Sequence, residues 1–102
     1  MMELEGAIKF LNELNQEDVS FDRHFYKRTG ERPISEGMVR SFLSQSNKLE
    51  KVEEGRNERF KLWFKMSTKY SLVLIIDKGF SKGLKVISAW NTNRKWQNKL
   101  KR

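Results

Sequence analysis

The sequence predicts a single α+β domain over residues 1–102, with N-terminal helices packed on one face of a four-stranded, mainly antiparallel sheet. Residues 1–47 are expected to be mainly helical, residues 48–91 to form the sheet, and residues 92–102 to form a basic C-terminal segment. Three observations lead to this class. The aliphatic run Tyr70–Ile76 lies between turn residues and predicts a strand buried on both faces. Alternating patterns beside it predict neighbouring strands, and apolar stripes at helical spacing predict the helices that cover them.

Three helical segments are expected before the sheet. The first covers residues 3–15, whose apolar positions form one stripe. Asp22 is expected to cap the second, which continues through Arg28 and leaves at Gly30. Between these two helices, Val19–Phe21 is either a short strand or an extended lead-in. The stripe of the first helix consists of Leu4, Ala7, Ile8, Leu11 and Leu14.

The third helix follows Pro33, which excludes helical backbone at Arg32. Ser35 is expected to cap it, and Glu36 suits the first turn because the helix dipole favours a negative charge there. This helix is expected to fray near residues 45–47. Its apolar face consists of Val39, Phe42 and Leu43.

The expected sheet begins with a charged edge strand at Leu49–Val52, a pattern that deters pairing with other chains. After a turn at Gly55–Asn57, residues 59–66 alternate with a period of two. The apolar set predicts a core face and consists of Phe60, Leu62, Phe64 and Met66. The other set surrounds one tryptophan with three cations, which is unusual for a merely solvated face. It consists of Arg59, Lys61, Trp63 and Lys65.

The last expected strand is Leu84–Trp90, which follows the central strand after a glycine-bearing loop at Asp77–Gly83. Because the connections are short, the last three strands are expected to form an antiparallel meander. Asn91–Asn93 is expected to cap one or two helical turns at Arg94–Leu100.

Charge is distributed unevenly along the chain, whose formal net charge is +8. All 13 acidic residues lie in residues 1–77 together with 13 of the 21 basic ones, so this part is neutral. The basic residues that follow have no acid among them, which predicts contact with a polyanion. The alternative is a solvated lysine-rich tail that keeps the protein in solution. These residues are Lys78, Lys82, Lys85, Arg94, Lys95, Lys99, Lys101 and Arg102.

Several classes of site are excluded or not expected. The absence of cysteine excludes disulfides, thiol catalysis and cysteine-based zinc sites. One histidine with scattered acids gives no metal-ligand spacing, so we expect neither a metal nor another cofactor. No apolar run approaches the ~20 residues that a membrane helix needs, and we therefore expect a cytoplasmic protein without membrane contact.

The segment Trp90–Trp96 carries the strongest functional signal, because two tryptophans, two asparagines and two cations interleave there. Aromatic rings stack on unpaired bases, amides read base edges, and guanidinium groups pair with phosphate. We expect Trp90 to meet a base and Trp96 to close the core. The expected RNA-binding residues are Trp90, Asn91, Asn93, Arg94, Lys95, Lys61, Trp63, Lys65, Lys85 and Lys99.

His24 is the only imidazole of the chain and lies one helical turn before Arg28. The pair would suit acid–base catalysis combined with stabilisation of the charge on a phosphorane. The alternative is that His24 caps or packs at the start of its helix. We favour this alternative because the adjacent cations disfavour a second positive charge.

Several short motifs between residues 19 and 96 occur in an order found in known families. They are Asp22–His24, Arg28, Arg32, Ile34–Ser35, Glu58–Phe60, Leu72–Ile76 and Val86–Ala89. The motifs before residue 36 resemble a family of small uncharacterised domains that open with a helix-turn-helix and continue into a sheet. The motifs after residue 57 resemble BrnT-type toxins, which are relatives of the RelE-type ribonucleases of toxin–antitoxin pairs.

The resemblance implies a RelE-like α+β fold, endoribonuclease activity on messenger RNA, association with the ribosome and an antitoxin partner. Glu58–Arg59 matches a Glu-Arg motif of the family, and Arg94–Lys95 lies in the basic segment after the last strand. Two positions depart from the pattern. Trp90 stands where those toxins tend to have a basic residue, and Trp96 lies near the place of a tyrosine. An indole cannot transfer a proton as a phenol can.

The expected function is RNA binding on a basic face made by the last strand and the tail, extended by metal-independent endoribonuclease activity. The candidate catalytic residues are Arg59, Glu58, His24 and Arg28. The alternative is a non-enzymatic protein-interaction or DNA-associated module. An enzyme should bring the candidate side chains into one cleft with Arg94, whereas a binding module would scatter them.

Overall fold

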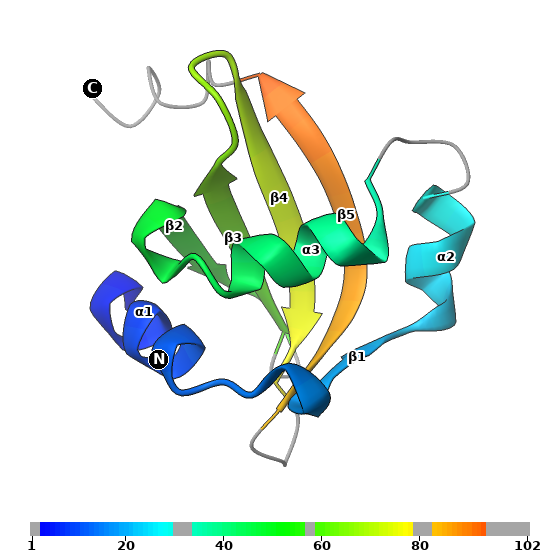
Figure 1. The fold of residues 1–102 in the computed structure, drawn as a ribbon, viewed down its shortest axis with the longest axis horizontal. Helices are drawn as coiled ribbons and strands as arrows, with labels where there is room; N and C mark the ends of the chain where they lie inside the picture. Colours follow the sequence, from blue (N-terminus) through cyan, green and yellow to red (C-terminus); the bar gives the residue numbers. More distant parts are fainter. Residues whose placement is uncertain (1–2, 30–33, 57–58, 79–82, 94–102) are drawn as a thin grey trace.

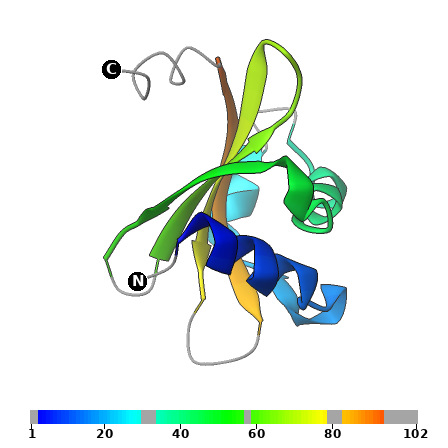
Figure 2. The same ribbon diagram turned by 90° about the vertical axis from the view of Figure 1, so that its left-hand side faces the viewer.

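The computed structural model describes residues 3–29, 34–56, 59–78 and 83–93, apart from the side chains of residues 27–29. The strands form one sheet in the order β1-β5-β4-β3-β2, and the helices gather on one side of it (Figures 1 and 2). The predicted α+β class is thus confirmed. Along the chain the elements are α1 (Leu4–Asn12), the 3-10 turn η1 (Gln16–Asp18), β1 (Val19–Phe21), α2 (Arg23–Thr29), α3 (Glu36–Leu43), the 3-10 turn η2 (Ser46–Lys48), β2 (Leu49–Glu54), β3 (Arg59–Lys65), β4 (Tyr70–Asp77) and β5 (Leu84–Asn93).

The sheet has five strands, so the prediction of four was wrong. The additional strand is β1, which pairs in parallel with β5 at the edge of the sheet and makes the sheet mixed. Three residues are too few to display an alternating pattern, and the partner strand lies far away in the sequence. The pairing needs Gly83, because a Cβ there would lie 2.1 Å from the carbonyl oxygen of Asp18. Glycine therefore lets the backbone before β1 approach the start of β5.

Strand β5 is longer than predicted, since it continues through Asn93 instead of ending at Trp90. Its last residues pair with the start of β4, where Asn93 lies opposite Tyr70. Pairing with β4 keeps Asn91–Asn93 extended, a backbone conformation that a helix-capping residue also adopts, so the cap expected there stays a prediction. The helical turns predicted at Arg94–Leu100 lie outside the described residues.

The helix caps predicted at Asp22 and Ser35 are confirmed. The amide of His24 donates to Asp22 Oδ2 (2.9 Å) at the start of α2. The amide of Met38 donates to Ser35 Oγ (3.1 Å) at the start of α3. These bonds satisfy backbone donors that the helices leave without intrahelical partners. Helix α1 is shorter than the predicted range of residues 3–15 and leads through a loop into η1.

The core lies between the helices and one face of the sheet, with β4 at its centre. Leu72, Leu74 and Ile76 point toward the helices, and each is at most 1% exposed. Ser71 and Val73 alternate with them toward the other face and are buried as well. The prediction of a central strand buried on both faces is therefore confirmed. The buried helical residues that pack on this sheet face are Ala7, Leu11, Phe25, Val39 and Leu43.

Candidate nucleic-acid interface

The side chains that alternate with the core residues of β2–β5 project away from the helices, and no described helix covers them (Figure 2). We refer to this surface as the open face. Its cations are Lys51, Arg59, Lys61, Lys65 and Lys85, its acids are Glu53 and Asp77, and its larger apolar side chains are Trp63, Val73, Ile75, Ile87 and Trp90.

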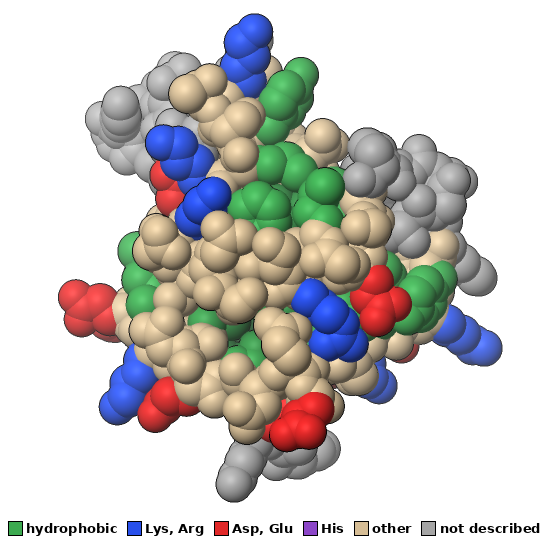
Figure 3. Space-filling model, viewed as in Figure 1, with side chains coloured by type: hydrophobic (Ala, Val, Ile, Leu, Met, Phe, Trp, Pro, Cys, Tyr) green, Lys and Arg blue, Asp and Glu red, His purple; other side chains and the backbone are tan. Residues whose placement is uncertain are grey.

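Charge is polarised across the part of the molecule that the structure describes. Cations outnumber acids on the open face, whereas acidic and basic side chains are interspersed on the helix-bearing face (Figure 3). Residues 3–22, which include α1 and η1, hold a single cation among several acids. Such a distribution would favour contact of a polyanion with the open face over contact with the α1 end. The charged residues of this acidic segment are Glu3, Glu5, Lys9, Glu13, Glu17, Asp18 and Asp22.

A cross-strand row runs through the middle of the open face. Lys51 on β2 lies opposite Trp63 on β3, which lies opposite Val73 on β4, which in turn lies opposite Trp90 on β5. Directly opposite side chains of antiparallel strands are about 4.5–5.5 Å apart at their Cβ atoms, so the two indoles flank Val73. Trp63 is only 6% exposed, while Trp90 is half-buried. The row thus offers a buried floor and one indole with accessible surface.

Lysine ammonium groups lie over both indoles of this row. Lys61 Nζ is 4.9 Å from the centroid of the Trp63 ring and 5.5 Å from that of the Trp90 ring. Lys51 Nζ is 4.5 Å from the Trp63 ring. Cation–π contacts of this kind contribute about 0.5–1 kcal/mol each at exposed sites. The arrangement holds positive charge directly beside an aromatic surface, which suits a ligand that carries both phosphates and flat bases.

Glu53 and Asp77, the acids that strand pairing places on the open face, lie beside cations. Glu53 Oε2 is 4.0 Å from Lys51 Nζ, at the outer limit of an ion pair. Asp77 lies in register between Arg59 and Lys85. Exposed pairs of this kind contribute little to stability. They lower the charge locally, and the surface retains an excess of cations.

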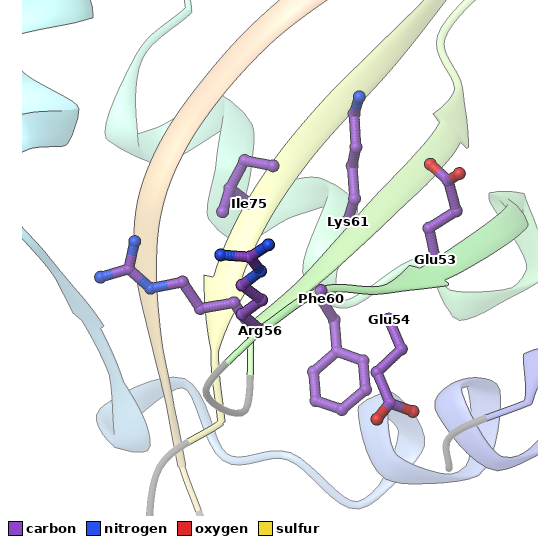
Figure 4. A pocket seen from close by; sticks show the side chains of 8 residues that line it. Glu53, Glu54, Arg56, Phe60, Lys61 and Ile75 are labelled. Atoms are coloured by element: carbon purple, nitrogen blue, oxygen red, sulfur yellow. The ribbon is translucent and has the colours of Figure 1, made fainter.

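One end of the open face is hollowed into a pocket of about 510 Å³ beside the turn between β2 and β3 (Figure 4). Backbone hydrogen bonds hold this turn, since Gly55 N donates to Arg59 O (2.7 Å) and Arg59 N donates to Arg56 O (3.1 Å). The pocket lining includes the guanidinium groups of Arg56 and Arg59 and the ammonium group of Lys61. Its lining residues are Glu53, Glu54, Gly55, Arg56, Arg59, Phe60, Lys61 and Ile75.

The predicted RNA-binding residues are divided between the two faces of the sheet. Five of them belong to the open face, namely Lys61, Trp63, Lys65, Lys85 and Trp90. Asn91 lies opposite Leu72 of the core, and Asn93 lies opposite Tyr70, so strand alternation directs both amides to the helix side. The amides therefore do not adjoin the two indoles. Arg94, Lys95 and Lys99 lie outside the described residues.

The predicted catalytic residues are also separated. Arg59 lines the pocket on the open face. His24 is exposed on α2, which packs from the helix side, and it does not line that pocket. The backbone of Arg28 continues α2, but its side chain is not among those described, and Glu58 lies outside the described residues.

Two residues of the interface were not predicted from the sequence. Lys51 was assigned only to a charged edge strand, and Arg56 only to a turn. A register shift between Leu49 and Lys51 brings Lys51 opposite Trp63, and the sequence carries no pattern for such a shift. The Arg-x-x-Arg spacing of Arg56 and Arg59 across a turn is a signal that could have suggested the pocket.

A separate polar network ties the helices to the start of the sheet. The Tyr26 hydroxyl donates to Glu36 Oε2 (2.9 Å), and Glu36 Oε1 is 3.5 Å from Arg40 Nη2. Arg40 donates to the carbonyl oxygens of Gln16 (2.8 Å) and Val19 (3.2 Å). The hydrogen bond to Glu36 raises the pKa of Tyr26, and burial and the Glu36 charge act in the same direction. These contacts join α2, α3 and the start of β1, so we assign this network a structural role.

The described residues contain neither a metal site nor a membrane-spanning helix, and the chain matches no known protein. Among the residues described, no group of three or more His, Cys, Asp or Glu side chains is placed to hold a metal ion. None of the helices described is long and apolar enough to cross a membrane. Comparison of the chain with known protein families, with curated proteins and with solved structures finds no match.

Proposed function

We propose that this protein binds single-stranded RNA on the open face of its sheet. The observation that carries the proposal is the cross-strand row Lys51–Trp63–Val73–Trp90, with the ammonium group of Lys61 over both indoles. Proteins that bind single strands combine a positively charged surface with aromatic rings on which bases stack. Duplexes bury the faces of their bases, so an aromatic surface favours unpaired strands.

Each part of the row has a distinct role in this proposal. Trp90 is the stacking partner, because it is the more exposed of the two indoles. Trp63 is the floor that holds Lys51 and Lys61 at 4.5 and 4.9 Å from its ring. Lys65 and Lys85 are exposed and would contact phosphates on either side. Binding would thus depend on shape and charge more than on the reading of base edges.

The proposal is tested by fluorescence anisotropy titrations with single-stranded RNA, the same RNA as a duplex, and single-stranded DNA of the same sequence. Single-stranded RNA should bind more tightly than the duplex. Trp90→Ala should weaken this binding by about 1–3 kcal/mol, the usual contribution of one stacked base. Tyr70→Ala is the matched control, since Tyr70 is 45% exposed on the helix side of the same sheet.

Two outcomes would contradict the proposal. Equal weakening by Trp90→Ala and Tyr70→Ala would show that aromatic surface in general, and not the open face, binds RNA. Tighter binding of duplex or of DNA would favour the alternative, a DNA-associated or protein-interaction module without enzymatic activity.

The second candidate function is metal-independent endoribonuclease activity on messenger RNA. It is favoured by the pocket that places Arg59 beside Arg56, Lys61 and the carboxylate of Glu53, because such groups can stabilise a phosphorane and move a proton. The resemblance to RelE/BrnT-type toxins is its second support and would add the ribosome and an antitoxin as partners in the cytoplasm.

Cleavage of a messenger RNA in excess EDTA, free and ribosome-bound, tests this second function. Wild type should cleave, and Arg59→Ala should lose activity. His24→Ala should retain activity if the chemistry is confined to the pocket, since His24 does not line it. Absence of cleavage by the wild type in either setting would contradict the enzymatic function and leave RNA binding.

A further inference from the structure

The pocket beside the β2–β3 turn lies at one end of the open face and differs chemically from the row of indoles. Its cations are mainly guanidinium groups, from Arg56 and Arg59, whereas the rest of the open face carries lysines. Arginine presents a planar fork of donors that matches the oxygens of a phosphate, while lysine acts as a point charge. The pocket is therefore suited to hold a phosphate group in a defined orientation.

The acidic side chains that line the pocket, Glu53 and Glu54, do not block access of a phosphate group to its cationic side. Figure 4 shows that Arg56, Lys61 and Ile75 project to one side of the sheet, while Phe60 and Glu54 project to the other. This division follows strand alternation, because Glu54 lies opposite Phe60 of the core face. The remaining acid, Glu53, lies 4.0 Å from Lys51 and is partly neutralised there. The open-face half of the pocket therefore has a net positive charge over an apolar floor at Ile75.

The position of the pocket suits the end of an RNA strand better than its middle. The β2–β3 turn closes the sheet at this point, and its backbone hydrogen bonds fix Arg56 beside Arg59. A terminal phosphate monoester carries about −1.5 to −2 charges near pH 7 when its second pKa is about 6, compared with −1 for an internal diester. Three cations in one pocket match this larger charge.

The pocket is also continuous with the proposed RNA surface. Arg59 and Trp63 are four residues apart on β3, which corresponds to about 13 Å along a strand. Lys61 lies between them, lines the pocket and carries its ammonium group over both indoles. An RNA strand whose terminal phosphate occupies the pocket would therefore reach Trp90 within a few nucleotides.

We propose, on the basis of the RNA binding proposed above, that this pocket receives the terminal phosphate monoester of a single-stranded RNA. The phosphate is held by the forked donors of Arg56 and Arg59 and by the charge of Lys61. The bases that follow extend along β3 toward the indole of Trp90. The protein thereby distinguishes strands with phosphorylated ends from strands with hydroxyl ends.

The test uses one oligoribonucleotide of about eight nucleotides, within the usual site size for single strands. It is prepared with a 5′-phosphate, with a 3′-phosphate, or with hydroxyls at both ends, and the three forms are titrated against the full chain. One phosphorylated form should bind about tenfold more tightly than the hydroxyl form, as expected for added charge-assisted hydrogen bonds. The form that gains affinity identifies which end of the strand enters the pocket.

Substitutions in the pocket test whether it is the site of the preference for phosphorylated ends. Arg56→Gln and Arg59→Gln should abolish the preference for the phosphorylated end, and they should weaken binding of the phosphorylated form more than binding of the hydroxyl form, because they remove the fork but not the indole row. Arg56→Lys, which keeps the charge without the fork, should retain part of the preference. Lys65→Gln is the matched control, since it removes one charge at the other end of β3 and should keep the preference.

Three results would overturn the inference. Equal binding of all three forms would exclude a terminal-phosphate site while leaving the proposed RNA binding in place. A preference that survives Arg56→Gln and Arg59→Gln would exclude this pocket as the site. Failure of every form to bind would contradict the proposed function itself and the inference with it.

Discussion

Trp63 and Trp90 occupy the same cross-strand row, yet their exposure gives them different roles. Trp63 is 6% exposed and has Val73 and Lys61 as neighbours. Trp63→Ala should therefore lower the free energy of unfolding by about 3–5 kcal/mol, the usual cost of truncating a buried aromatic side chain. Urea denaturation followed by circular dichroism measures this change. A loss below about 1 kcal/mol would show that the Trp63 site is solvated in solution.

Tyr26 gives a prediction about pH. Its hydroxyl donates to Glu36, and its pKa is raised above the ordinary value of 10.0. Because the pKa is higher in the folded state, the bond stabilises the protein below pH 10 and is lost as the pH rises through the folded-state pKa. Unfolding by urea between pH 8 and pH 11 should show this loss in the wild type. Tyr26→Phe should be less stable at pH 8 and should lack this part of the decline.

At the residue scale, the sequence predicts side chains on long alternating strands well and side chains near strand ends poorly. Lys61, Trp63 and Lys65 share one face because seven residues of β3 alternate without interruption. Asn91 and Asn93 were expected beside Trp90, but β5 continues past Trp90 and alternation turns both away from it. Where a strand ends depends on pairing with β4, which the local sequence does not specify.

Gly83 is the point at which β1 and β5 depend on a single side-chain choice. Gly83→Ala would place a Cβ 2.1 Å from the carbonyl oxygen of Asp18, so the backbone would have to move. We expect a loss of about 1–3 kcal/mol in the free energy of unfolding, as for overpacking in a core. The amides of β1 should also exchange faster in hydrogen–deuterium exchange, because the pairing with β5 would be weakened.

Gly6→Ala is the matched control, since nothing lies within 4 Å of a Cβ at Gly6 in α1. It should stabilise the protein by about 0.5–1 kcal/mol, the helix-propensity difference between glycine and alanine. A Gly83→Ala variant as stable as the wild type would contradict the close approach of the two strands.

At the scale of elements, local patterns predict the antiparallel part of the sheet. The β2–β5 strands are joined by short connections and show alternating or continuous apolar patterns, so their order and the helix caps at Asp22 and Ser35 could be read from the sequence. For β1 the sequence left a short strand and an extended lead-in open, and the parallel pairing of this strand with β5 could not be predicted. Its three residues carry no period, and its partner is distant in the sequence, so only tertiary contacts decide its state.

At the scale of the whole molecule, the polarised charge predicts how binding depends on salt. Replacing the four open-face lysines by glutamine should flatten the slope of log Kobs against log salt concentration by up to ~0.7 per lost phosphate contact. The control removes the same charge from the helix-bearing side and the turns, and it should alter the slope much less. The two sets are Lys51, Lys61, Lys65 and Lys85, and Lys9, Arg23, Lys48 and Lys69.

Equal slopes for these two variants would contradict a localised interface, because net charge alone would then govern binding. The same measurement tests whether the basic C-terminal segment contributes to RNA binding. Deletion of residues 98–102 removes Lys99, Lys101 and Arg102, and an unchanged slope would identify the tail as an element that only maintains solubility.

The parallel pairing of β1 with β5 has a consequence for synthesis of the protein. Among the strands described, the one that is synthesised first pairs with the one that is synthesised last, in register from Val19 with Leu84 to Phe21 with Val86. On the ribosome, β1 must therefore wait until β5 has emerged before the two strands can pair. Closing so long a loop is slow, so we expect this edge to form after the folding transition state. Val19→Ala should then accelerate unfolding in stopped-flow experiments and leave the refolding rate nearly unchanged. Until that pairing, a nascent chain presents the bare edge of β5 to its neighbours, and it is at this stage that its aggregation would compete with folding.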